Sequence, residues 1–76
     1  MVILSKNKNI AVFKYEDIYV VSMRDCFQMR AGKVGGSEDA GDILGSYKSV
    51  ERCHEILQQI VNAYKDGLLL FEMPKE

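Results

Sequence analysis

Four neighbouring residues carry side chains that can hold an anion. Tyr47, Lys48, Ser49 and Arg52 lie where an extended run gives way to a helix-forming run. The free N–H groups at the start of a helix favour negative charge, and a hydroxyl and two cations add to that preference. Tyr47 beside Lys48 offers a ring on which a ligand can stack. These residues are the candidate ligand-binding site, and the ligand would be a phosphate or a carboxylate.

A structural role for the same residues is the alternative. A cation in the first helical turn opposes the helix dipole, so Arg52 needs a compensating negative charge. That charge can come from a bound anion or from a carboxylate, namely Glu51, Glu55, Glu72 or a residue of a neighbouring subunit. Tyr47 can equally be a core or interface residue.

No catalytic residue and no metal ligand is expected elsewhere. His54 is the only histidine, and it follows Cys53 directly, a spacing at which helical side chains diverge. The acidic residues Glu38, Asp39 and Asp42 lack the spacing of a calcium loop. The sequence therefore predicts a protein that is not an enzyme and has no cofactor.

The clearest element is an amphipathic helix over 49–66. Ser49 is a helix-capping residue, and Gly67 suits the left-handed position that ends a helix. Between them, apolar residues recur at three- and four-residue steps, at Val50, Cys53, Leu57, Ile60, Val61 and Tyr64. We expect this stripe to face a sheet.

The rest of the chain favours strands. Residues 1–31 alternate like a β-meander, residues 42–48 form a further strand, and residues 68–73 form a last one before Pro74. Gly45, within the second of these segments, suits a bulge or a close approach. Between the strands, residues 32–41 are rich in glycine, which predicts a flexible loop. The order of its glycine and lysine residues differs from that of the P-loop motif.

These elements predict an α+β domain over 1–76, with one helix packed on an antiparallel sheet of about five or six strands. The final strand is apolar on both faces, so we expect it to be central or covered by another subunit. A chain of 76 residues buries only about 60% of the surface that its unfolded form exposes. A homo-oligomer would supply the missing burial.

Charge and composition narrow the class of protein. The net charge of −1 comes from dispersed side chains, which argues against nucleic-acid binding. No apolar run approaches the length of a membrane span, and no signal peptide is evident, so we expect a soluble, cytoplasmic protein. Cys26 and Cys53 are expected to be free thiols.

The last 35 or so residues carry the segments ILGSYKSVERCHEILQQI, YKDG and FEMP. This pattern resembles a family of short uncharacterised proteins of phages and prophages of Gram-positive bacteria. The matching positions are Gly45, Tyr47, Ser49, Arg52, Phe71, Met73 and Pro74. The N-terminal half departs from the family, because relatives often begin with a tryptophan-containing strand where this chain has Val2, Ile3 and Leu4. The resemblance implies a phage or prophage context, in the host cytoplasm, and the family carries no established activity that could be transferred to this chain.

Two functional hypotheses remain at this point. The first is a non-enzymatic accessory protein that acts as a homo-oligomer by binding a host or phage protein. The second is an oligomeric protein that sequesters a small anionic, nucleotide-like ligand, with Lys48, Arg52 and the loop 32–41 around it, in a possible counter-defence role.

Overall fold

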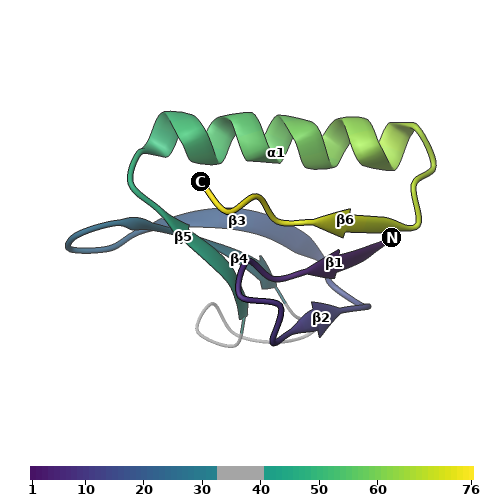
Figure 1. Ribbon diagram of the computed structural model, residues 1–76, viewed down its shortest axis with the longest axis horizontal. Coiled ribbons are helices and arrows are strands. Elements are labelled where there is room, and N and C mark those ends of the chain that lie inside the picture. The colour runs from purple at the N-terminus through teal and green to yellow at the C-terminus, as the bar shows by residue number, and fades with distance from the viewer. Residues whose placement is uncertain (33–40) are drawn as a thin grey trace.

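The computed structural model describes residues 1–32 and 41–76. Within them, one helix and six strands follow each other along the chain (Figure 1). Their bounds are β1 (Val2–Leu4), β2 (Ala11–Val12), β3 (Asp17–Ser22), β4 (Phe27–Gly32), β5 (Asp42–Tyr47), α1 (Val50–Lys65) and β6 (Leu70–Glu72). The predicted α+β class, the single helix and the final strand after it are confirmed. The predicted flexible loop lies almost wholly outside the described residues, as do Glu38 and Asp39.

The expectation of a single sheet is wrong, because the strands form two three-stranded sheets. The first has the order β2-β1-β6 and the second the order β3-β4-β5. The β1–β6 pair is parallel, so the strands are not all antiparallel either. The predicted meander over 1–31 divides between the two sheets because β2 has only two residues and does not pair with β3. Alternation along a strand indicates its faces but does not indicate its partner.

The second sheet is the more regular of the two. β3 and β4 form a hairpin with Ile18 opposite Ala31 and Val20 opposite Met29, which places all four side chains on one face. β5 pairs with β4 on both sides of a register shift that lies between Met29 and Arg30. The hairpin turn projects at the opposite end of the molecule from the start of β6 (Figure 1). The helix α1 packs against all three strands of this sheet.

In the first sheet, β1 lies between β2 and β6. Ile3 is opposite both Val12 and Phe71, and Ile3 is fully buried. β6 is therefore an edge strand, and the expectation that it is central is wrong. Phe71 packs against the core whereas Leu70 is half exposed. The alternative expectation, that another subunit covers this strand, stays a prediction.

The helix begins and ends where the sequence predicts. Ser49 caps it, and Gly67 takes the left-handed conformation at φ 73°. Gly67 N–H donates to Tyr64 O and Leu68 N–H donates to Ala63 O, a pattern that closes the last turn of a helix at a left-handed glycine.

The buried face of α1 is rotated from the expected stripe. The residues that are buried are Cys53, Ile56, Ile60 and Ala63. Val61 and Tyr64, which the periodicity placed in the core, are at least half exposed instead. The sequence offers apolar side chains on two adjoining faces of the helix, and only one of them meets the sheets.

One hydrophobic core joins both sheets and the helix. It comprises Ile3, Val12, Met29, Ala31, Leu44, Tyr47, Cys53, Ile56, Ile60 and Met73. Neither sheet could bury its apolar face alone. Within the described ranges, no helix is both long and apolar enough to cross a membrane.

Candidate functional site

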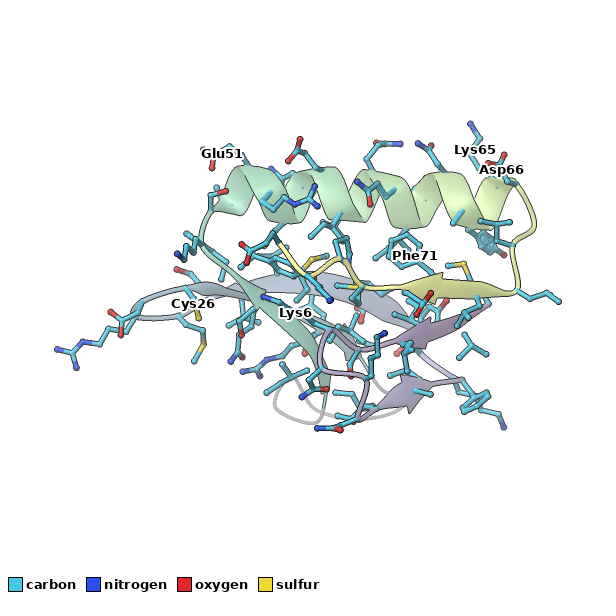
Figure 2. All side chains as sticks on the ribbon, in the orientation of Figure 1. Lys6, Cys26, Glu51, Lys65, Asp66 and Phe71 are labelled. Atoms are coloured by element: carbon cyan, nitrogen blue, oxygen red, sulfur yellow. The ribbon has the colours of Figure 1, made fainter. Side chains whose placement is uncertain are left out.

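The four candidate ligand-binding residues all line one hollow of about 340 Å³ at the start of α1. The residues around it are Lys6, Cys26, Ser46, Tyr47, Lys48, Ser49, Arg52 and Glu76. We call this site the cationic hollow, after Lys6, Lys48 and Arg52. In Figure 2, Cys26 lies at the end of the molecule where α1 begins.

Ser49 performs the capping role that its position predicts. Its Oγ accepts a hydrogen bond from the backbone N–H of Arg52 at 3.1 Å, while its backbone is extended. One of the free N–H groups at the helix start is thereby satisfied within the chain. The Ser49 hydroxyl oxygen therefore already accepts a hydrogen bond from the helix, and a ligand in the hollow would share it.

We expect Ser49→Ala to lower the free energy of unfolding by about 1 kcal/mol, because the cap accepts a backbone hydrogen bond that alanine cannot replace. Urea denaturation followed by circular dichroism would measure the change. Ser49→Asp is the matched control, since a carboxylate also caps a helix and favours its N-terminus. Equal losses in both variants would contradict the capping role.

Arg52 is already engaged by oxygen atoms of the chain. Its Nε donates to the main-chain oxygen of Glu76 at 2.6 Å, and its Nη1 lies 3.6 Å from Oε1 of Glu55. Glu55 is one of the carboxylates that the structural alternative named. An anion entering the hollow would have to share the guanidinium with these partners.

Lys6 also belongs to the hollow, although no pattern in the sequence connects it with the start of the helix. Its Nζ donates to Ser46 O at 2.8 Å and lies 4.7 Å from the centre of the Tyr47 ring, within range for a cation–π contact. The main chain brings it there, because Lys6 N–H donates to Leu44 O at 2.7 Å. No local signal connects residues 40 positions apart.

Gly45 permits this approach. A Cβ on Gly45 would lie 3.0 Å from Cβ of Lys6 and 3.2 Å from the Tyr47 ring. Such distances are tighter than ordinary van der Waals contact, so a side chain there would displace the lysine or the ring. The absence of a side chain at Gly45 was the only sign in the sequence that another segment comes close.

Tyr47 has its ring in the core and its hydroxyl on the C-terminal segment. Only 4% of the residue is exposed, and its hydroxyl donates to Pro74 O at 2.6 Å. Burial raises the pKa of Tyr47 to about 12, although the positive charge of Arg52 acts in the opposite direction. The phenol therefore stays neutral, as a donor that is already occupied.

Most of the charged side chains around the hollow are cationic. Three cations from different segments surround it, and Lys48 is exposed. In the part of the chain that the structure describes, no group of three or more His, Cys, Asp and Glu side chains could hold a metal ion. His54 is exposed whereas Cys53 is buried, and burial raises the pKa of the Cys53 thiol.

A second feature lies at the other end of α1. Five large side chains there are at least half exposed, and Leu69 is exposed by 84%. They are Val61, Tyr64, Leu68, Leu69 and Leu70, and we call them the apolar surface. Clusters of this kind on a folded protein mark sites of interaction.

A groove of about 310 Å³ adjoins this surface between α1 and β3. Its lining is almost entirely apolar and consists of Met1, Tyr15, Ile18, Leu57, Ile60, Val61, Tyr64 and Lys65. Tyr15 closes one side through a hydrogen bond from its hydroxyl to Met1 O at 3.1 Å. Burial, and to a lesser extent Tyr64, raises the pKa of Tyr15. The groove could not be predicted from the sequence, because the apolar periodicity places Val61 and Tyr64 in the core.

No protein-family model, no curated protein and no solved structure matches this chain. The resemblance to the phage and prophage family therefore stays a prediction from the sequence.

Proposed function

We propose that this chain is a non-enzymatic accessory protein of a phage or mobile element that works in the host cytoplasm, as a homo-oligomer, by binding a host or phage protein. The observation that carries the protein-binding part is the apolar surface, with Leu69 at 84% exposure. The genetic context rests on the sequence pattern from Gly45 to Pro74. The oligomer rests on the small core of a 76-residue chain.

Several properties of the apolar surface suit protein binding. Leucine side chains present area without a polar group that must be desolvated, and Tyr64 adds an amphipathic ring of the kind enriched at interfaces. Lys65 and Asp66 border the patch and can form a polar rim (Figure 2). Leaving this area in water costs free energy that a partner would recover.

The proposal predicts that Leu69→Lys lowers the affinity for the partner at least ten-fold, because a central apolar contact is replaced by a charge. Tagged wild-type and variant proteins would be compared in affinity capture from phage-infected host cells, followed by mass spectrometry. Met23→Lys is the matched control, since Met23 is also exposed, by 42%, but lies in the β3–β4 turn at the far end. Equal capture by the wild type and Leu69→Lys would contradict this use of the surface.

The second candidate function is sequestration of a small anionic, nucleotide-like ligand. It is favoured by one observation, namely that all four residues selected from the sequence line a single hollow together with Lys6. Against it, Arg52 and Lys6 already have oxygen partners within the chain. A ligand would have to interact with Arg52 and Lys6 more favourably than these oxygen atoms of the chain do.

Arg52→Ala separates this candidate from a structural role. If the hollow binds anions, calorimetric titration with a nucleoside monophosphate should show affinity for the wild type that falls at least ten-fold in the variant and weakens with salt. Arg52→Lys is the control that retains the charge but loses the two-pronged geometry. Lost stability without any wild-type affinity would assign Arg52 to the structural role alone.

A further inference from the structure

We infer that the partner covering the apolar surface is a second copy of this chain, related to the first by a two-fold axis. This inference rests on the proposed function, because it names a second copy of the chain as an occupant of the surface through which the protein is proposed to bind. A host or phage protein would compete with that copy for the same surface.

The first argument is the shape of the surface. A two-fold interface uses the same patch on both copies, so the patch must contain both a projection and a hollow of matching chemistry. Leu69, which is exposed by 84%, provides the projection. The adjoining groove is the hollow, and the hydrogen bond from Val2 N–H to Leu69 O fixes the two side by side, since Met1 lines the groove. Leu69 of one copy can therefore fill the groove of the other.

The second argument is the charge at the border. Lys65 lines the groove and Asp66 caps the helix next to it, so the two opposite charges lie together at the end of α1 (Figure 2). A two-fold axis through this border sets Lys65 of each copy against Asp66 of the other. The border is thus complementary to itself, whereas a partner with a charge of one sign would be repelled by one of the two residues.

The third argument is area. Five large side chains that are at least half exposed leave on the order of 500 Å² of apolar surface on one copy, as much as the largest patch on a typical monomer. Pairing two copies buries about 1,000 Å² before the polar rim is counted, which approaches the roughly 1,200 Å² at which specific interfaces begin. A 76-residue chain gains from this burial more than a larger domain would.

Sedimentation velocity across a wide concentration range tests the inference on the full chain. We expect the wild type and Met23→Lys to sediment as dimers. The Leu69→Lys dimer should dissociate at concentrations at least ten-fold higher than those at which the wild-type dimer dissociates. Since the contact is mainly apolar, the wild-type dimer should persist in high salt. Circular dichroism would establish that each variant is folded.

Charge reversal provides an independent test that no structural effect of Leu69 can imitate. Lys65→Glu sets two carboxylates against each other across the axis, so it should weaken the dimer several-fold. Adding Asp66→Lys restores opposite charges and should restore the affinity. Failure of the double variant to recover would overturn the two-fold arrangement.

The remaining outcomes separate the inference from the proposed function. A dimer unaffected by Leu69→Lys would overturn the inference, because the copies would meet elsewhere. A wild type that stays monomeric would also overturn it, and the proposed function would then stand if a phage or host protein is captured in a Leu69-dependent way. A monomer without such capture would overturn both.

Discussion

Replacing Ile56 by alanine is expected to lower the free energy of unfolding by about 3 kcal/mol. Ile56 has no exposed surface and lies in the core cluster between the helix and the sheets. Its truncation removes buried methyl groups and leaves a cavity that the surroundings fill only in part. Because a chain of this length is stabilised by only about 4–11 kcal/mol, the loss is a large fraction of the total. Urea denaturation at equilibrium would measure it.

Ile43→Ala is the matched control, since it makes the same chemical change at a residue that is 43% exposed. We expect it to cost less than half as much, because little of the removed surface is buried in the folded state. The higher helix propensity of alanine at position 56 opposes the loss there slightly. Equal costs at both positions would mean that Ile56 does not occupy the centre of the core.

Tyr47→Phe is expected to have the second-largest effect, in two parts. At neutral pH the variant should lose about 1–3 kcal/mol, because the carbonyl of Pro74 is left without its donor. The second part is a change in pH dependence. The pKa of Tyr47 is raised from 10.0 to about 12 in the folded protein, so the folded state holds this proton more tightly than the unfolded state does.

The sign of the alkaline effect follows from that difference. The stability linked to the Tyr47 proton is fully present below pH 10 and is lost as the pH rises through about 12. The wild type should therefore lose stability across this window, and Tyr47→Phe should lose less. Denaturation midpoints measured at several alkaline pH values would test this. Tyr64→Phe, at an exposed tyrosine, is the control. If it changed the dependence of stability on alkaline pH as much as Tyr47→Phe does, the assignment of this dependence to Tyr47 would be contradicted.

Local features of this chain could be predicted from its sequence. The cap at Ser49 and the left-handed Gly67 are decided by residues within one helical turn, and both were found correctly. The face of the helix that becomes buried depends instead on where the sheets lie. With apolar residues on two adjoining faces, the periodicity chose Val61 and Tyr64 where the fold buries Ile56 and Ala63.

Pairing between distant segments could not be predicted. Alternation identified strand segments, but nothing in it indicates that β6 joins β1 in parallel or that the sheet is divided. The residues of the candidate site could likewise be predicted only where they are close together in the sequence. Tyr47, Lys48, Ser49 and Arg52 were found together because they are adjacent in sequence, whereas Lys6 and Glu76 reach the hollow only through tertiary packing.

The pairing of β1 with β6 also bears on how the chain folds during synthesis on the ribosome. Val2 lies opposite Leu70, so the first sheet cannot be completed until Leu70 has left the exit tunnel. The β3–β4–β5 sheet has only antiparallel neighbours that are consecutive in sequence, and it can form earlier. Until β6 pairs with it, β1 has one unpaired edge and the side chain of Ile3 is incompletely buried. A pause in translation before Leu70 has left the tunnel would therefore prolong the time during which this strand is open to chaperones and to aggregation.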